Sequence, residues 1–414
     1  MKVYSSLNCA MHRFCIGVYV KAGCIYEPEE LNGITHLYEH MVFRNIKSRY
    51  SEDFYELLTQ NGLAFEAGTY KEFLYFTITG LPIGIKLTTE ILSHLFDDIT
   101  IDKEDFRIEK NRVKAEIRES TEKQSLSYFA DCEIWNGTTL KNTILGTCRT
   151  IDSISQKKIN DYKNTIISSD NVIVYVTGNV DASQMKLIEN AVSSMKVSDE
   201  KLNRQNLAPI PPDFQNRKPV VTSKNASYHR VRISVDIDNS DCPFDVRDML
   251  YTTLFVDENA LIFQELSENN PLVYSYDSVF EQYKNISSLK LEYEISKKNI
   301  SESVRLIFNV FNRLKNGDFN FENNLQKLMT QWEVLQDDVC DLNWSLAYEN
   351  HILGDSTADY NKEKFGRYAN LTKEKVMKSA KKIFRSSNIS LALKGDKKHI
   401  QSLNIEDLLK ILDT

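Results

Sequence analysis

The chain repeats itself, because two stretches of its first half have counterparts at matching places in its second half. FYELLTQNGLAF (54–65) aligns with FQELSENNPLVY (263–274), and SSDNVIVYVTGN (168–179) aligns with SSNISLALKGD (386–396). A duplication leaves two copies of one fold, and each copy must bury its own core. The repeat therefore predicts two similar domains.

A proline-rich segment separates the two copies. LAPIPPDFQNRKP, residues 207–219, holds four of the eight prolines of the chain. Clustered prolines form semi-rigid, extended spacers. We therefore expect an N-terminal domain at residues 1–206 and a homologous C-terminal domain at 220–414, joined by this linker. A length of 414 residues agrees with two or three domains of ordinary size.

Both halves show the same order of expected elements: a strand, two helices ending in a turn, further strands, long helices and a last strand closed by glycine. Residues 73–79, FLYFTIT, mix β-branched and aromatic side chains as strands do. Residues 102–135 show helical periodicity with a charged outer face. The predicted class is α+β, with two homologous domains that each have a mixed or antiparallel sheet and helices packed on one face.

The composition excludes several kinds of partner. Hydrophobic residues make up 42% of the chain and charged residues 26%, which is usual for a water-soluble globular protein. The net charge of −7 is spread along the chain, and basic residues do not cluster with aromatic ones, so we expect no nucleic acid partner. Apolar runs are much shorter than the roughly 20 residues that cross a membrane, so we expect no membrane span.

The cysteines indicate a reducing compartment. Seven cysteines lie at scattered spacings without a C-x-x-C pair, which favours reduced, mostly buried thiols over a disulfide framework or a thiolate zinc site. The first 20 residues lack the charged start, apolar stretch and cleavage site of a signal peptide. The expected location is the cytoplasm.

One short motif indicates a catalytic metal site. His36, Glu39 and His40 form the pattern H-x-x-E-H in a chain with only seven histidines. On a helix, residues four apart project from the same face, so both imidazoles can bind one zinc ion. Zinc lowers the pKa of bound water to about 7, and Glu39 lies close enough to act as the general base. This is the motif of inverted zinc proteases, and Asn32 is expected to cap its helix.

The five letters alone leave an alternative open, namely a surface helix with two solvated histidines and a glutamate. A third ligand would distinguish a zinc site from a solvated surface helix, because catalytic zinc usually has three protein ligands and one open position. Glu109 and Glu116 lie seven residues apart and so occupy one face of an expected helix. Periodicity does not select between them, since that helix is rich in acids.

Beyond the motif, five stretches that span nearly the whole chain match a known family: VKAGCIYEPEELNGITHLYEHMVFRN, NGLAFEAGTYKEF, EKNRVKAEIRES, LKNTILGTCRTI and NVIVYVTGNVD. With them the chain resembles the pitrilysin/insulinase family of inverted-motif zinc peptidases, in particular its small two-domain branch of mitochondrial processing peptidase subunits and bacterial peptide-maturation peptidases. The resemblance implies one zinc ion per chain, held by His36, His40 and Glu116, with Glu109 as the partner of a ligand histidine.

The resemblance also implies how a substrate is held. An extended peptide adds a strand to the edge of the N-terminal sheet, where main-chain pairing recognises shape more than sequence. The family usually has Asn-Ala-x-Thr there, whereas this chain has a glutamate in place of the asparagine, which favours a basic side chain nearby. The expected substrate contacts are Phe65, Glu66, Ala67, Gly68 and Thr69.

The C-terminal half departs from the family pattern. The family has an arginine and, seven residues later, a tyrosine that hold the substrate carbonyl at the zinc site of a facing domain. Here the tyrosine is Tyr274, but Ser267 replaces the arginine. A donor aimed at a developing oxyanion is worth about 3 kcal/mol, so we expect a homologous partner subunit without zinc to supply the Arg/Tyr pair. Tyr274 has a second interpretation as a half-buried strand aromatic.

Together these features predict a zinc metalloendopeptidase that hydrolyses peptides or short unfolded segments, as the catalytic subunit of a heterodimer. Small bacterial members of the family often accompany peptide-maturation systems, so maturation of a precursor or its leader is the expected role. One alternative is a non-catalytic subunit of a peptidase complex, although such members typically lose a histidine or Glu39. Another is general degradation of oligopeptides, which composition does not separate from maturation.

Overall fold

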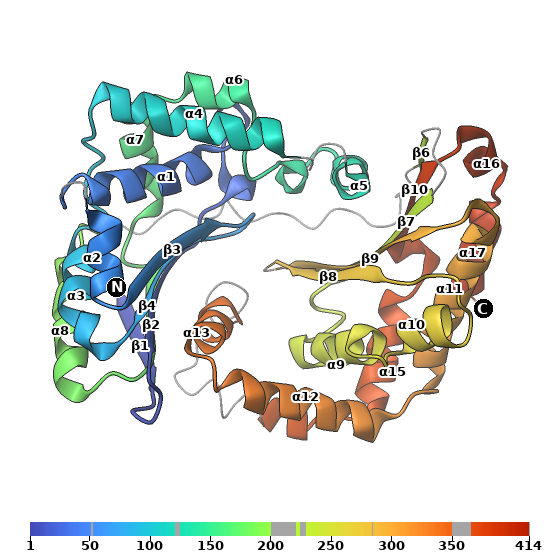
Figure 1. Ribbon diagram of the computed structural model, residues 1–414. Helices are drawn as coiled ribbons and strands as arrows, with labels where there is room; N and C mark the ends of the chain where they lie inside the picture. Colours follow the sequence, from blue (N-terminus) through green and yellow to red (C-terminus); the bar gives the residue numbers. More distant parts are fainter. Residues whose placement is uncertain are drawn as a thin grey trace. The chain divides into compact units, whose positions relative to one another are not determined.

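The computed structural model in Figure 1 describes residues 1–50, 53–120, 125–199, 221–223, 229–283, 285–349 and 366–413. The expected linker at 207–219 lies outside the described residues. The chain divides into two compact units. The first contains the described residues within 1–120, 142–209 and 334–358, and the second those within 121–141, 210–333 and 359–414.

The first unit is built on a five-stranded sheet of order β1-β5-β2-β4-β3. β1 runs parallel to β5, and the other neighbours pair antiparallel, so the sheet is mixed. β3 is an edge strand that pairs with β4. The strands are β1 (Lys2–Leu7), β2 (Phe14–Val20), β3 (Leu63–Thr69), β4 (Leu74–Gly80) and β5 (Val172–Gly178).

Helices from the N-terminal half cover one face of this sheet (Figure 1). α1 contacts β3, α3 packs against α8, and α4 packs on α1 from outside. This arrangement brings α1 and α4 together beside the edge strand. The helices are α1 (Ile34–Lys47), α2 (Phe54–Gln60), α3 (Ile85–Ser93), α4 (Lys103–Glu119), α6 (Cys148–Ser153), α7 (Gln156–Ile166) and α8 (Ala182–Ser194).

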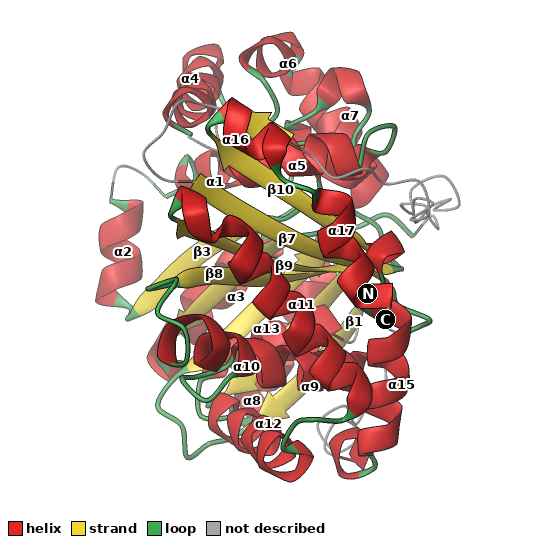
Figure 2. Cartoon of the chain, turned by 90° about the vertical axis from the view of Figure 1, so that its right-hand side faces the viewer, coloured by secondary structure: helices red, strands yellow, loops and turns green. Residues whose placement is uncertain are grey.

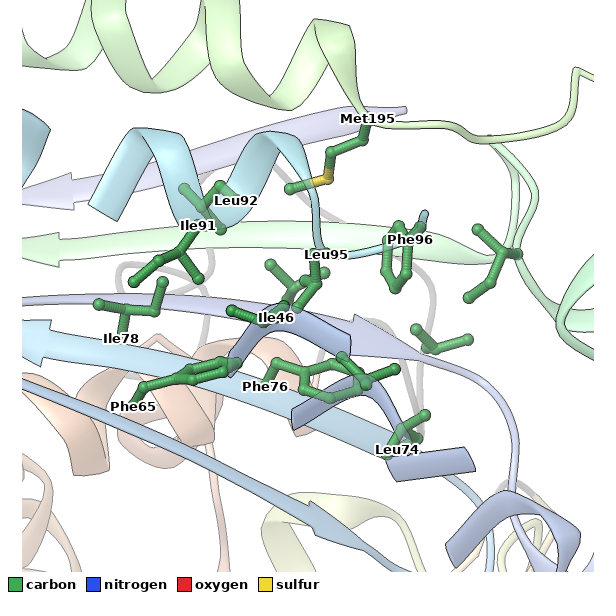
Figure 3. Packing of buried hydrophobic residues seen from close by; sticks show 14 of the residues in the cluster. Ile46, Phe65, Leu74, Phe76, Ile78, Ile91, Leu92, Leu95, Phe96 and Met195 are labelled. Carbon is green, nitrogen blue, oxygen red and sulfur yellow. The ribbon is translucent and has the colours of Figure 1, made fainter. Parts of the chain in front are cut away.

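The hydrophobic core of the first unit fills the space between the sheet and these helices. Phe65 of β3 and Phe76 and Ile78 of β4 lie close to Ile46 of α1 and Ile91 of α3 (Figure 3). Burying one such side chain stabilises the fold by about 1.5–3 kcal/mol. The core therefore fixes α1 and the edge strand relative to one another.

The opposite face of the same sheet is covered by α13 (Val339–Ala347), which comes from the second half of the sequence. Asn343 is fully buried there, and its amide donates to the carbonyl oxygens of Cys15 at 3.1 Å and Tyr175 at 3.0 Å. The Tyr19 hydroxyl donates to Asn343 Oδ1 at 2.8 Å. Gly17 leaves the necessary room, because a Cβ at this position would overlap Asn343 Oδ1.

The second unit repeats the strand order of the first, as β6-β10-β7-β9-β8. Its first two neighbours, β6 and β10, again run parallel, and β8 again lies at the edge. The predicted α+β fold with two similar sheets is therefore confirmed. The strands are β6 (Val221–Ser223), β7 (His229–Asp238), β8 (Tyr276–Gln282), β9 (Ile286–Ile295) and β10 (Ile389–Gly395).

Helices α9 and α11 each pack against α15, which also contacts β7 of the second sheet (Figures 1 and 2). Besides α13, the α-helices described in the second half of the sequence are α9 (Phe244–Phe255), α10 (Leu261–Phe263), α11 (Ile300–Asn316), α12 (Phe321–Leu335), α15 (Lys373–Ile383), α16 (Lys397–Ser402) and α17 (Ile405–Lys410). A π-helical turn, η8 (Gln264–Glu268), follows α10. Within the described ranges, the structure shows no helix that is both long and apolar enough to cross a membrane.

The second sheet also receives one helix from the other half of the sequence. α5 (Leu126–Ile134) contacts β7 and β10. The side chain of Arg232, which is only 1% exposed, donates to the carbonyl of Ser127 at 2.6 Å and to Asp131 at 2.7 Å. The predicted helical stretch at 102–135 thus contains two helices, α4 in the first unit and α5 in the second. The prediction placed helices on one face of each sheet. The structure adds one further helix to each sheet from the other half of the sequence, namely α13 in the first unit and α5 in the second.

Candidate metal centre

Helix α1 carries the H-x-x-E-H motif, and a distant residue fixes its start. The helix begins after Gly33, whose φ is 95°. The buried Glu27 carboxylate accepts the backbone N–H groups of Gly33 at 2.7 Å and Thr35 at 2.8 Å, which satisfies donors that a helix N-terminus leaves free. Asn32 does not cap the helix, and its amide instead donates to Glu27 at 2.9 Å. That prediction was wrong because the acceptor comes from farther upstream.

Two histidines of α1 face a glutamate of α4. His36 Nε2 lies 3.5 Å from Glu116 Oε2, and His40 Nε2 lies 3.7 Å from Glu116 Oε1. One ligand atom from each of the three residues lies within 4.8 Å of the others. Two imidazoles and a carboxylate form a donor set that suits zinc with an open fourth position. In the part of the chain that the structure describes, this is the single cluster that meets these criteria.

The three side chains differ in exposure. Those of His36 and His40 are 12% and 19% exposed, whereas that of Glu116 is 46% exposed. Burial is the main reason that the pKa of His36 falls to about 3, and the neighbouring His40 lowers it further. A neutral imidazole keeps the lone pair that a metal needs. The cluster therefore combines a buried neutral ligand with a side that opens to solvent.

Glu109 contacts His40 on the Nδ1 side of its ring, whereas Glu116 lies on the Nε2 side. Glu109 Oε2 is 3.5 Å from His40 Nδ1, while its Oε1 accepts from Arg112 at 3.1 Å and lies 3.7 Å from Arg44. Burial acts to lower the pKa of His40, but the bond to Glu109 and the charge of Glu116 outweigh it, so this pKa is raised. A carboxylate at Nδ1 orients an imidazole and leaves its Nε2 for a metal. The structure thus separates two glutamates that periodicity left equivalent.

Glu39 lies beside the cluster and is held by the edge strand. The Thr69 hydroxyl donates to Glu39 Oε2 at 2.6 Å. Burial raises the pKa of Glu39, while the bond from Thr69 and the charge of His40 oppose this rise. A raised pKa makes a carboxylate a stronger base near neutral pH. The sequence pointed to Thr69 only as a substrate contact, and its bond to Glu39 was missed because no local pattern links residues thirty positions apart.

A cavity of about 250 Å³ opens beside Glu39 and His40. Its lining mixes aromatic, basic and acidic side chains, and the Lys47 ammonium lies 4.8 Å from the centre of the Tyr55 ring. Six of the eight lining residues carry an acidic, basic or imidazole group, so the cavity is more polar than a typical pocket for a small organic ligand. The sequence did not single out its further lining residues, which are Phe43, Arg44, Lys47, Tyr55 and Arg112.

The predicted substrate strand coincides with β3. Phe65 is buried and its ring packs 4.4 Å from that of Phe43, so its side chain belongs to the core. Glu66 is exposed, and Ala67, Gly68 and Thr69 are half-buried. Because β3 lies at the edge of its sheet, its outer backbone groups are available for pairing.

The two predicted residues of the C-terminal half lie in the second unit. Tyr274 is 97% exposed and precedes β8, so it is not a half-buried strand residue. Ser267 lies in the π-helical turn, and its hydroxyl donates to the Val273 carbonyl at 2.6 Å. Its short side chain is therefore engaged with the local backbone.

The chain matches two family models and several known proteins. Residues 2–148 match the model of insulinase, peptidase family M16, and residues 153–331 match the peptidase M16 inactive domain. A Bacillus subtilis protein, described as the uncharacterized zinc protease YmxG, is 23% identical over 286 residues, which is 69% of each chain. The beta subunit of the mitochondrial-processing peptidase of Rattus norvegicus is 26% identical over 178 residues. That match spans 42% of this chain and 36% of the relative.

Solved structures share the whole fold. A protease from Helicobacter pylori superposes with a TM-score of 0.79 at 15% identity, over 95% of this chain and 96% of the other. A putative M16-like peptidase from Alicyclobacillus acidocaldarius gives 0.78 at 14% identity, over 95% and 96%. Both matches extend across the two units, so the fold as a whole is similar.

Proposed function

Because this chain belongs to the insulinase (M16) family of peptidases, we propose that it is a zinc metalloendopeptidase acting on peptides or short unfolded segments. The observation that carries the proposal is the cluster of His36, His40 and Glu116, whose ligand atoms lie within 4.8 Å of one another. Glu39 lies beside this cluster with its carboxylate held at 2.6 Å by Thr69. The alternative, a surface helix with solvated histidines, does not explain why three ligand side chains lie close together or why Thr69 binds the Glu39 carboxylate.

The residues divide the work of hydrolysis between them. Zinc, when bound by His36, His40 and Glu116, supplies the Lewis acid that activates water and polarises the scissile carbonyl. The Glu39 carboxylate takes a proton from the attacking water and returns it to the departing amine. Glu109 orients His40 and leaves its Nε2 turned towards Glu116. Thr69 fixes the direction in which the Glu39 carboxylate points.

An extended peptide would pair with the outer edge of β3. Main-chain hydrogen bonds to Ala67, Gly68 and Thr69 would hold it without a strict sequence requirement. Thr69 is one of these contacts, and its hydroxyl also binds the general base Glu39. A peptide paired with β3 would therefore lie beside Glu39. The exposed Glu66 favours a basic side chain in the bound peptide. Folded proteins would be poor substrates because the bound segment must be extended.

The catalytic unit is proposed to be a heterodimer. Ser267 occupies the position where the resemblance leads us to expect an arginine, and its hydroxyl is bonded to Val273. A homologous partner without zinc would supply the Arg/Tyr pair, and Tyr274 of this chain is proposed as a further substrate contact. The mitochondrial relative is itself named as a subunit. The proposed role is maturation of a precursor or leader peptide in the cytoplasm, with general oligopeptide degradation as the alternative.

Metal analysis and hydrolysis test this proposal together. The partner is first identified by pull-down from native cells, and the complex is assayed on a quenched fluorescent peptide. We expect about one zinc ion per chain, its loss in His40→Ala, and a Glu39→Gln variant that keeps zinc but does not cleave. Glu119→Gln, on the exposed surface of α4, is the matched control and should behave as wild type.

Two outcomes would contradict the proposal. A complex that cleaves equally well with Glu39→Gln would show that this chain is a non-catalytic subunit. Full turnover by the purified chain alone would exclude the requirement for a partner, while leaving the metal centre intact.

A further inference from the structure

Two cysteines from opposite ends of the sequence meet on the face of the first sheet that α13 covers. Cys15 is fully buried near the start of β2, where it pairs with Thr79 of β4. Cys340 lies in the first turn of α13, with its sulfur 3.5 Å from the Thr79 hydroxyl. Residues paired across antiparallel strands point their side chains to the same face, so the Cys15 side chain lies beside the Thr79 hydroxyl that the Cys340 sulfur contacts. The sulfur atoms are therefore neighbours, although the sequence shows no cysteine pair.

The first turn of α13 is fixed on both sides of Cys340. Before it, the Asp338 side chain accepts the backbone N–H of Cys340 at 2.7 Å. Beside it, the Thr177 hydroxyl donates to the carbonyl of Val339 at 2.7 Å. After it, the buried amide of Asn343 binds the strand backbone. These bonds hold Cys340 against Cys15 without any contribution from a disulfide.

The two thiols differ in accessibility and acidity. Cys340 is half-buried, and the hydrogen bond from Cys15 is the main reason that its pKa falls to about 6, although burial opposes this effect. Among the charged groups nearby, Arg13 also lowers this pKa and Asp338 raises it. The hydrogen bond to Cys340, together with burial, raises the pKa of Cys15 well above its usual value. Reactive cysteines are low-pKa, partly exposed thiolates next to a second thiol.

We propose that Cys15 and Cys340 form a peroxide-sensitive thiol pair whose oxidation joins α13 covalently to β2. The proposal is independent of zinc and of peptide hydrolysis. Hydrogen peroxide is the oxidant, Cys340 is the residue attacked first, and Cys15 is the resolving thiol. The product is a disulfide between the two halves of the sequence within one compact unit.

The chemistry balances in two steps. The Cys340 thiolate attacks one oxygen of the peroxide, the O–O bond breaks, and hydroxide leaves to give a sulfenic acid and, after protonation, water. Cys15 then gives up its proton and attacks the Cys340 sulfur, which displaces hydroxide and forms the S–S bond and a second water. The two sulfurs together lose two electrons, and one peroxide is reduced to two waters.

The experiment uses the full chain, reduced and then treated with an equal amount of hydrogen peroxide. Remaining thiols are blocked with N-ethylmaleimide before digestion and mass spectrometry. We expect a linked pair of peptides containing Cys15 and Cys340, which separates on reduction. A Cys148→Ser variant, which removes another half-buried thiol, is the matched control and should form the same link.

Single variants assign the order of the steps. In Cys15→Ser, dimedone should label Cys340, because its sulfenic acid has no thiol to resolve it. In Cys340→Ser, Cys15 should remain reduced and be recovered as a thiol. If Cys15→Ser does not fold, the linked peptides of the wild-type chain and the protection of Cys15 in Cys340→Ser still decide the question.

Three results would overturn the proposal. The first is recovery of both thiols unoxidised while the exposed Cys9 is oxidised. The second is oxidation of Cys15 at the same rate in Cys340→Ser as in wild type. The third is a product dominated by disulfides between chains.

Discussion

The two units share one strand order but carry different side chains at equivalent places. In the first unit, the first α-helix after β2 is α1, with His36, Glu39 and His40 on it. In the second unit, the helix that follows the equivalent strand β7 is α9, whose sequence FDVRDMLYTTLF has no histidine. The fold alone therefore does not make the metal cluster, and chemistry resides in side chains placed on it.

The units also differ in how each holds the helix that it receives from the other half. In the first unit, α13 is attached through the neutral amide of Asn343. In the second, α5 is attached through a charged carboxylate, because Asp131 binds both Arg232 and Lys290. The two similar sheets thus hold their additional helices by a neutral hydrogen-bonding amide in one unit and by ion pairs in the other. Variants at Asn343 and Asp131 should distinguish these two kinds of attachment.

The largest expected effect comes from Asp131→Ala. This change leaves the buried charge of Arg232 without its carboxylate, and loss of one partner of a buried pair costs about 3–5 kcal/mol of unfolding free energy. Urea denaturation should show this as an earlier transition. Glu133→Ala, at an exposed position of the same helix, is the control and should leave the transition in place. Equal transitions for both variants would show that α5 does not depend on the ion pair.

Asn343→Ala tests the neutral attachment. It removes the donors to two strand carbonyl oxygens and the acceptor of the Tyr19 hydroxyl, so we expect a loss of about 2–3 kcal/mol. Urea denaturation at low and high salt should show the same loss, because no charge is involved. Asp341→Ala on the exposed side of α13 is the matched control. A strong salt dependence would contradict the contrast between the units.

Glu109→Gln tests the orientation of His40. Loss of a carboxylate that orients a ligand imidazole typically lowers metal affinity by about 10–100-fold. Competition with a chromogenic zinc chelator should show a weaker affinity at constant stoichiometry. The control is Glu119→Gln, an exposed glutamate at the C-terminal end of the same helix. Unchanged affinity would show that Glu109 only balances Arg44 and Arg112.

Thr69→Val tests the link between the edge strand and the general base. The variant keeps the shape of the side chain but removes the hydrogen bond to Glu39, so we expect kcat/KM for peptide hydrolysis to fall by about tenfold. Zinc content should not change, which separates this effect from damage to the metal cluster. Thr89→Val on α3 is the control. A loss of zinc would mean that Thr69 supports the ligands and not the base.

The sequence predicts the local features of the site better than its long-range contacts. Helical spacing places His36 and His40 on one face of α1, and this prediction depends on only five residues. The choice of Glu116 over Glu109 came from the family resemblance, since it depends on how α4 packs on α1. The bond between Thr69 and Glu39 depends on where β3 lies beside α1, which local patterns do not encode.

The same limit applies to the fold. Repeated segments and stretches of β-branched and aromatic residues predict two similar sheets, because each such signal is found in a short run of consecutive residues. The exchange of α5 and α13 was not predicted, because it depends on pairs such as Asn343 with Cys15, which lie far apart in the sequence. The cysteine pattern likewise showed no pair, although Cys15 and Cys340 are neighbours in space. Features fixed by one element were thus predictable, and features fixed by two distant elements were not.

The smallest expected effect is a pH dependence that distinguishes a cysteine of each unit. The pKa of Cys340 is lowered to about 6, whereas burial is the main cause that raises the pKa of Cys242 to about 12. A lowered thiol pKa means more thiolate at neutral pH, so alkylation of Cys340 by iodoacetamide should rise through pH 6 and then level off. Cys242 should stay unmodified over the same range. In Cys15→Ala the donor is lost, so the pKa of Cys340 should rise and its alkylation at neutral pH should slow. Equal profiles for wild type and variant would show that the Cys15 thiol does not stabilise the Cys340 thiolate.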